Sequence, residues 1–259
     1  MIPLLAGVFG LLVGSFLNVV VHRVPEHGSL LPRSACPRCG HRIRAWDNIP
    51  VLSWLVLRGR CRDCRGPISA RYPLVEAGTA VLFALTARWT GASWSLPALL
   101  FLVAVSVALA LIDLDVHRLP DVIVLPSIGV GVLLLAVASW NPGGVSDWGA
   151  LLRAVLGGLA LCGFYLVVAL VYPGGMGLGD VKLAGLLGLY LTWFGWPMLL
   201  VGGFAGFVLG GVFAVSLMIA RRATKGSGIP FGPWMLLGAA VGIVAGRSIW
   251  SAYLGLIGF

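Results

Sequence analysis

The sequence predicts an all-α polytopic membrane protein of about eight transmembrane helices, with a small polar cytoplasmic domain between the first two. Two observations carry this prediction. Of the 259 residues, 59% are hydrophobic and only 10% are charged, with a mean hydropathy of +1.00, whereas roughly a quarter of the residues in a soluble domain are charged. Long apolar runs also occupy most of the chain outside one arginine-rich stretch. The composition therefore excludes a soluble globular enzyme.

Eight apolar runs are expected to form the helices, because about 20 residues cross the hydrocarbon core of a bilayer. The runs cover residues 1–21, 73–89, 96–112, 122–140, 148–172, 181–194, 197–220 and 231–257. The sixth run has only 14 residues. We therefore expect that helix to be tilted, or broken against its neighbours.

The basic residues predict the orientation of the chain in the membrane. Lys and Arg number 18 against 9 Asp and Glu, a net charge of +9, and such residues accumulate in cytoplasmic loops. If the first helix runs inward, fifteen of the eighteen lie on the cytoplasmic side. Because no basic residue precedes the first run, it is expected to be a helix and not a signal peptide. Both termini are predicted outside, and no nucleic-acid partner is needed to explain the charge.

The stretch between the first two helices differs sharply from the rest of the chain. It holds ten arginines and only three acidic residues, so we expect a small cytoplasmic domain there. The predicted organisation is helix 1 over residues 1–21, a polar domain over 22–72 and a seven-helix membrane core over 73–259.

Four cysteines in this polar domain form the strongest local motif. They make two C-x2-C pairs, Cys36/Cys39 and Cys61/Cys64, separated by 21 residues, close to the spacing of four-cysteine zinc sites. A reducing cytoplasm disfavours the alternative of disulfides, and a 50-residue polar loop has too little core to fold unaided. The motif therefore predicts a closed, structural Zn²⁺ site. The fifth cysteine, Cys162, lies in an apolar run and is expected to be inert.

Glycines recur every fourth residue in the last two helices. This spacing lines one helical face without side chains, so that another backbone can pack closely. We expect packing seams there and no chemistry. The glycines are Gly202, Gly206 and Gly210, and Gly238, Gly242 and Gly246.

Acidic residues are scarce in this chain. Placing an ionisable side chain within a membrane span costs free energy, so such a residue is a candidate functional group. Asp113 closes the uninterrupted apolar run 102–112 and is expected to be the most buried acid of its local group. Asp121 and Glu76 are expected to have structural roles, the first at a helix start and the second compensating a helix dipole or pairing with Arg71.

Asp180 lies in a glycine-rich segment, residues 174–182 (GGMGLGDVK). Its glycines, including Gly177 and Gly179, favour a closely packed backbone that delivers the carboxylate at membrane depth. A nucleotide-binding interpretation fails because no strand precedes the segment and the GK[ST] of a phosphate loop is absent. Lys182 follows two residues after the aspartate.

Two carboxylates at one membrane face suggest an aspartyl hydrolase. If Asp113 and Asp180 converge on one water, charge repulsion makes the pair share a proton. The ionised partner then takes a proton from water while the protonated one polarises the scissile carbonyl. Proton-coupled carriers also use intramembrane acids, so the residues alone leave the hydrolase and the carrier open.

At the level of motifs, the chain resembles the type IV prepilin peptidase family over nearly its whole length. The blocks that carry the resemblance are GSFLNVVVHRVP (14–25), CPRCGHRIRAWDNIPVLSW (36–54), GRCRDCRGPISARYPLVE (59–76), ALIDLDVHRLPDVIVLP (110–126), GMGLGDVKL (175–183) and IPFGP (229–233). By this resemblance Asp113 and Asp180 are the catalytic aspartates. Gly177, Gly179 and Lys182 then belong to the active-site loop.

The resemblance implies cleavage of type IV prepilins or pseudopilins after a glycine that ends a basic leader, at the cytoplasmic face of the bacterial inner membrane. It also implies N-methylation of the new N-terminus with S-adenosylmethionine, an activity associated with the cysteine-containing loop, although no binding motif for this donor is evident. Membrane lipids are expected partners of the arginines. Two alternatives are a membrane carrier with a zinc-dependent regulatory loop, and a membrane methyltransferase without protease activity.

Overall fold

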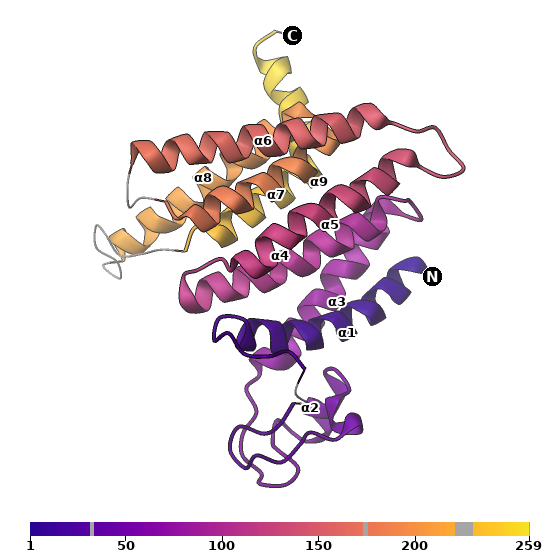
Figure 1. Cartoon of the computed structure of the whole chain (residues 1–259), viewed down its shortest axis with the longest axis vertical. Coiled ribbons are helices and arrows are strands. Elements are labelled where there is room, and N and C mark those ends of the chain that lie inside the picture. The colour runs from indigo at the N-terminus through magenta and orange to yellow at the C-terminus, as the bar shows by residue number, and fades with distance from the viewer. Residues whose placement is uncertain (32–33, 173–175, 221–229, 259) are drawn as a thin grey trace. The chain divides into compact units, whose positions relative to one another are not determined.

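The computed structural model describes residues 1–31, 34–172, 176–220 and 230–258, and within them the chain is helical without any β-strand (Figure 1). Some residues used in the sequence analysis lie outside the described part of the chain. They are Arg33, Arg221, Arg222 and Lys225, which belong to the fifteen basic residues expected on the cytoplasmic side, Gly174 and Gly175 of the glycine-rich segment, and Ile229 of the last quoted block. The helices are α1 (Ile2–Arg23), η1 (Ala45–Asn48), α2 (Leu52–Val56), α3 (Arg71–Thr90), α4 (Leu96–Val116), α5 (Asp121–Trp140), α6 (Trp148–Val171), α7 (Leu178–Phe194), α8 (Trp196–Ile219) and α9 (Gly232–Leu256).

Each of the eight apolar runs is a helix, so the expected all-α membrane fold is confirmed. Among the described residues, six helices are long and apolar enough to cross a membrane: α1, α4, α5, α6, α8 and α9. The other two long helices, α3 and α7, carry charged residues at or near their starts, and α7 has only 17 residues. Length and composition thus identify six spans, while the remaining two depend on their packing.

The chain divides into two compact units, Met1–Ala108 and Leu109–Phe259. In the first, α1 and α3 pack antiparallel through a glycine face that the sequence analysis did not single out. A Cβ atom at Gly10 would lie 2.8 Å from Cα of Ala80, and one at Gly14 would lie 2.8 Å from Cα of Glu76. Such contacts are possible only between bare backbones. They press α1 directly against the turn of α3 that carries Glu76.

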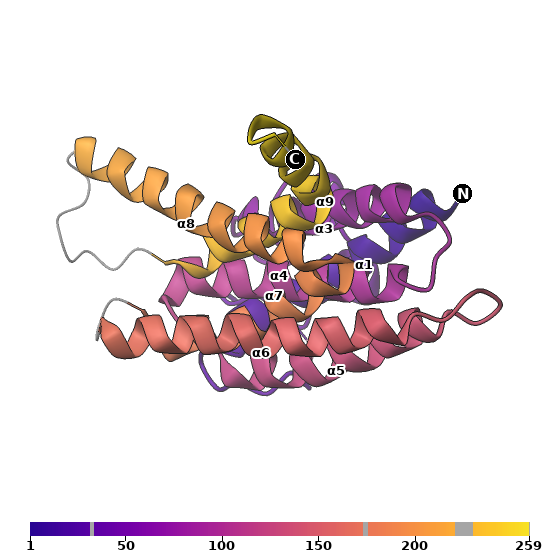
Figure 2. The same cartoon turned by 90° about the horizontal axis from the view of Figure 1, so that it is seen from above.

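The second unit is built around α7. From Val181 to Thr192, all but one residue of this helix is buried. Figure 2 shows α5 and α6 on one side of α7 and α8 and α9 on the other, and α7 contacts all four. The short run expected to be tilted or broken is thus one uninterrupted helix, and its polar start lies among protein neighbours, which remove the need for a full-length apolar span.

The glycine seams of α8 and α9 are confirmed. A Cβ atom at Gly242 would lie 2.7 Å from Cα of Gly202, and one at Gly206 would lie 3.3 Å from Cα of Met235. Gly238 faces the backbone of Gly206 even more closely. Side chains at these positions would force the two helices apart, so the glycines serve packing.

Candidate functional site

Asp113 lies in the last turn of α4 and is only 5% exposed. Its Oδ2 atom accepts a hydrogen bond of 3.0 Å from the backbone amide of Gly232, the first residue of α9. A buried carboxylate needs such a donor, because an unpaired polar group in a low-dielectric interior is costly. The expected burial of Asp113 is therefore observed, and the structure adds the partner that holds it.

Gly232 cannot be replaced by a larger residue without displacing that carboxylate. A Cβ atom at this position would lie 2.7 Å from Asp113 Oδ2 and 3.4 Å from Leu119. The lack of a side chain therefore lets the start of α9 approach the aspartate closely enough for the amide to donate.

Asp180 lies in the first turn of α7, at the third position after its N-cap, Gly177. The amide of Gly177 donates to Asp180 Oδ2 at 3.3 Å, and the Asp180 amide donates to the Gly177 carbonyl at 3.0 Å. A helix N-terminus favours negative charge, since its free amides and dipole point toward the group. The glycine-rich segment thus ends in a helix start that orients the aspartate.

Asp113 and Asp180 both lie in the second unit, and their carboxylates are close enough for their negative charges to repel each other. The neighbouring contacts agree, because a Cβ atom at Gly179 would lie 3.0 Å from Cβ of Leu119, which follows the end of α4. Tyr165 of α6 is buried, interacts electrostatically with Asp180 and stacks on Phe207 with ring centroids 5.4 Å apart. Two acids from distant parts of the chain thus lie near each other beside a buried aromatic residue.

Lys182 lies in α7, and its Nζ atom is 2.7 Å from both carboxylate oxygens of Asp121. Asp121 makes no side-chain cap at the start of α5, where Pro120 is the N-cap. The expected capping role of Asp121 is therefore replaced by an ion pair that ties the start of α5 to the start of α7. This pair neutralises Lys182 beside the two aspartates.

The four cysteines form two similar knuckles in the first unit. In each knuckle the amide of the first cysteine donates to a carbonyl five residues later: Cys36 to His41 at 2.9 Å and Cys61 to Gly66 at 2.8 Å. The residue after the second cysteine has a positive φ in both, a glycine in one and Arg65 (57°) in the other. The left-handed turn thus brings each pair of thiols to one side of its knuckle.

The geometry of the sulfur atoms fits a tetrahedral metal ion. All four lie within 4.8 Å of one another, and the Cys36 and Cys64 sulfurs are 3.8 Å apart. Zinc–sulfur bonds of about 2.3 Å in a tetrahedron separate the sulfurs by about 3.8 Å. The two knuckles therefore hold their thiols close to the spacing of a tetrahedral zinc site, and the Cys36–Cys64 pair matches it.

The acidities of the thiols also indicate a cation site. Amide hydrogen bonds from Cys39 and Arg38 lower the pKa of the Cys36 thiol to about 6. The amide of His41 favours the Cys39 thiolate as well, but desolvation and the three neighbouring thiols raise the pKa of Cys39 to about 12. Four thiolates this close repel one another unless a cation neutralises them, and metal binding provides that charge.

Two ion pairs brace the cysteine knuckles. Arg62 donates three hydrogen bonds of 2.6 to 3.0 Å to the Asp47 carboxylate, and Arg44 lies 3.3 Å from Asp63. The Arg62 guanidinium holds the pKa of Asp47 below its ordinary value through these hydrogen bonds and its charge. Asp47 and Asp63 of this unit thus each form an ion pair with an arginine.

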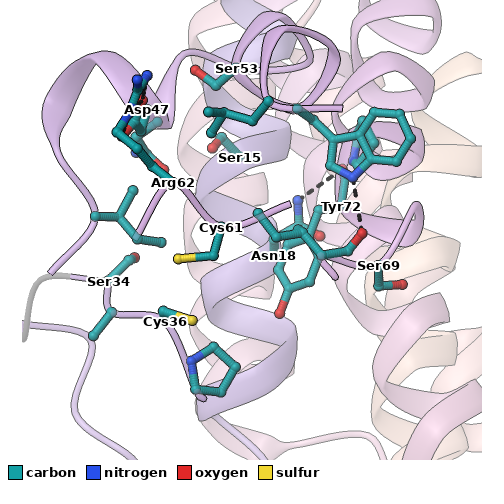
Figure 3. Close-up of a pocket in the computed structure, with 18 of the residues that line it drawn as sticks. Ser15, Asn18, Ser34, Cys36, Asp47, Ser53, Cys61, Arg62, Ser69 and Tyr72 are labelled. Atoms are coloured by element: carbon teal, nitrogen blue, oxygen red, sulfur yellow. Dashed lines mark hydrogen bonds and ion pairs between the residues drawn. The ribbon is translucent and has the colours of Figure 1, made fainter. Parts of the chain in front are cut away.

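A cavity of about 460 Å³ lies between the knuckles and the helix pair of the first unit (Figure 3). Figure 3 shows Asn18 of α1 beside Tyr72 of α3, and the Asn18 side-chain amide donates to the Tyr72 carbonyl at 3.2 Å. Cys36 and Cys61 also line the cavity. Glu76 of α3 belongs to the wall and accepts a hydrogen bond of 2.7 Å from the Val51 amide, a partner that the sequence did not indicate.

Sequence reasoning missed three residues of these sites. Gly232 stood in the quoted IPFGP block without a role, and Tyr165 looked like any aromatic residue of an apolar helix. For Glu76 the sequence predicts helix-dipole compensation or a pair with Arg71, whereas the observed partner amide lies 25 positions earlier. The quoted IPFGP block was the one available signal, and it contains Gly232.

Comparisons with known proteins agree with this architecture. Residues 8–90 match the bacterial peptidase A24 N-terminal domain, and residues 99–215 match the type IV leader peptidase family. No solved structure matches the chain.

Full-length relatives are named prepilin leader peptidase/N-methyltransferase. The protein from Pseudomonas putida is 42% identical, with 98% of this chain and 94% of the relative covered. Those from Pseudomonas aeruginosa and Neisseria gonorrhoeae are each 38% identical, with 96% of this chain and 92% of each relative covered. The resemblance seen in the sequence motifs is thereby confirmed, and the chain belongs to the prepilin leader peptidase/N-methyltransferase family.

Proposed function

We propose that Asp113 and Asp180 are the catalytic pair with which this membrane enzyme removes the leader peptide of type IV prepilins or pseudopilins. The observation that carries the proposal is the proximity of two acids, one ending α4 and one beginning α7, within the second unit. Family membership favours this peptidase over the membrane carrier, whose intramembrane acids need no such pairing.

The chemistry follows from two carboxyl groups that share one proton. The ionised carboxylate accepts a proton from a water molecule as the water oxygen attacks the scissile carbonyl carbon. The protonated carboxyl group donates to the carbonyl oxygen, and the leaving amine then takes a proton from the pair. Because Gly232 and Gly177 each donate to one of the two carboxylates, both acids keep a fixed orientation while the proton moves.

The site is proposed to face the cytoplasm of the bacterial inner membrane. This proposal is supported by the concentration of arginines between α1 and α3, since basic residues accumulate in cytoplasmic loops. Anionic lipid headgroups are expected to contact these arginines. A prepilin whose apolar helix lies in the bilayer then presents its basic leader at the level of the two aspartates.

The four-cysteine cluster is proposed to hold one structural Zn²⁺. Four sulfur ligands would come from Cys36, Cys39, Cys61 and Cys64, which leaves no open position for a reacting water. When bound, the ion supplies charge neutralisation that stabilises the folded loop. The unit that contains the cluster is also proposed to support N-methylation with S-adenosylmethionine, the second activity in the names of the full-length relatives.

The test is mass spectrometry of a prepilin N-terminus after incubation with the purified enzyme and methyl donor. Asp113→Asn and Asp180→Asn are each expected to slow leader removal at least about a hundredfold, since each removes a general acid–base group. Asp115→Asn is the matched control, an exposed acid two residues along the same helix, and it should cleave at a nearly normal rate.

The product distinguishes the candidate functions. A shortened and methylated N-terminus supports the bifunctional enzyme, whereas methylation of an added pre-cleaved pilin without any leader removal supports a methyltransferase alone. An unchanged substrate would favour the carrier. Near-normal cleavage by either Asp→Asn variant would refute the catalytic pair.

A further inference from the structure

The cavity of the first unit has the size and lining of a small-molecule site. Its volume of about 460 Å³ falls within the range of cofactor and ligand pockets, roughly 300 to 1,000 Å³. Trp54 and Tyr72 supply aromatic surface, and the Trp54 indole nitrogen donates to the Ile68 carbonyl at 3.1 Å, which fixes its ring. Such a wall suits a heteroaromatic base, which stacks on aromatic side chains.

Of the three acids that line the cavity, Glu76 is the one without an ion pair to an arginine among the contacts of the described residues. Asp47 and Asp63 pair with arginines, whereas among the described residues the structure gives Glu76 only the Val51 amide as a partner. Glu76 is 8% exposed and lines the cavity. Arginines also line this cavity, namely Arg23, Arg38, Arg42 and Arg62, but no ion pair to Glu76 is formed by a described residue, and a carboxylate in this state favours a positively charged ligand beside it.

The backbone that meets Glu76 is strained. Val51 has a φ of 61° and a ψ of −49°, and the amide of Leu52 donates to the Pro50 carbonyl at 2.6 Å, which together define the rare γ-turn. This conformation is unfavourable for a β-branched residue and persists only where the surroundings enforce it, often at functional sites. Here it aims the Val51 amide at Glu76. Gly14 of α1 packs on Cα of Glu76 as well.

We propose that this cavity binds the methyl donor, a sulfonium compound of the S-adenosylmethionine class, and that Glu76 takes the proton which the pilin amine must lose before methylation. The inference rests on the proposed methyltransferase activity. All the lining residues belong to the matched N-terminal domain. Residues at the end of α1 and the start of α3, including His22 and Tyr72, also line the cavity.

The proposed step balances as follows. The Glu76 carboxylate accepts one proton from the N-terminal ammonium group of the cleaved pilin and leaves a neutral amine. The nitrogen lone pair then forms a bond to the methyl carbon as the carbon–sulfur bond breaks, and that electron pair stays on sulfur as a thioether. The donor supplies only the electrophilic methyl group. The product is a methylated ammonium group that keeps the positive charge, so no oxidant or reductant is required.

Two pairs of variants test the proposal in the purified full-length enzyme. Ser15 of α1 lines the cavity, so Ser15→Trp fills it. The control is Phe16→Trp, because Phe16 is the next residue, is 54% exposed and does not line the cavity. Glu76→Gln removes the proton acceptor while keeping an acceptor for the Val51 amide, and Glu26→Gln, an exposed acid of the same unit, is its control. The readouts are leader cleavage without donor, methylation of a pre-cleaved pilin, and equilibrium binding of radiolabelled S-adenosylmethionine with ultraviolet cross-linking and peptide mapping.

Ser15→Trp is expected to weaken donor binding and abolish the cross-link in residues 15–76, while leader cleavage shows that the variant is folded. Glu76→Gln is expected to slow methylation at least about a hundredfold and to leave cleavage intact. Normal donor binding by Ser15→Trp, or normal methylation by Glu76→Gln, would overturn this inference but leave the proposed methyltransferase activity standing. A wild-type enzyme that cleaves prepilin but neither binds the donor nor methylates would overturn the proposed methyltransferase activity together with it.

Discussion

Replacing Gly232 with alanine should impair leader cleavage through a single methyl group. Its carbon would lie 2.7 Å from Asp113 Oδ2, closer than carbon and oxygen atoms approach without repulsion, so the carboxylate or the start of α9 must move. The movement lengthens the 3.0 Å hydrogen bond from the Gly232 amide. A hydrogen bond to a charged group contributes about 1.5 to 3 kcal/mol, which corresponds to a rate loss of about ten- to a hundredfold if the carboxylate reacts.

The assay is the initial rate of leader removal from a prepilin at saturating substrate. Gly255→Ala is the matched control, because it lies on the same helix and a Cβ atom there meets nothing within 4 Å. The control should cleave normally, and Gly232→Ala should still methylate a pre-cleaved pilin. Wild-type cleavage by Gly232→Ala would refute the argument that the amide of α9 positions Asp113.

Three further predictions concern the remaining polar contacts. Metal analysis should find about one zinc per chain, and Cys61→Ser should lose it together with the thermal stability of the first unit; a folded wild-type enzyme without metal would contradict the site. Arg62 depresses the pKa of Asp47, so that pair stabilises the fold above about pH 4 and loses this effect as the pH falls through the depressed value. Asp47→Asn should therefore lower the melting temperature at pH 7, and its deficit should shrink as the pH falls below about 4; a deficit that does not change with pH would disprove the charge argument. Lys182→Gln should slow cleavage less than about tenfold, because an exposed pair with Asp121 contributes only about 1 kcal/mol or less, and complete inactivity would instead place Lys182 in the chemistry.

Much of the fold could be predicted because membrane helices are encoded locally. Apolar length alone located the segments that became α4, α5 and α6, and the four-residue glycine spacing located the contact between α8 and α9. The short helix α7 was harder to anticipate, since its regularity comes from four surrounding helices and not from its own composition.

The candidate sites were predictable where chemistry resides in rare residues. Asp113, Asp180 and the four cysteines stand out because acids and thiols are scarce in an apolar chain. Their partners could not be found in this way, because backbone amides such as those of Gly232 and Val51 carry no residue-type signal. The role of Glu76 depends on a turn 25 residues earlier, and no periodicity within α3 points to that turn.

The hydrogen bond from Gly232 to Asp113 spans 119 positions of the chain, and this separation bears on biogenesis. During synthesis α4 enters the bilayer long before α9 has been translated, so Asp113 first resides there without its amide donor. The nascent chain is consequently unable to orient this carboxylate until α9 has been made and has packed beside α4. Proteolytic competence therefore has to wait for a helix that is translated more than a hundred residues after the aspartate that it holds.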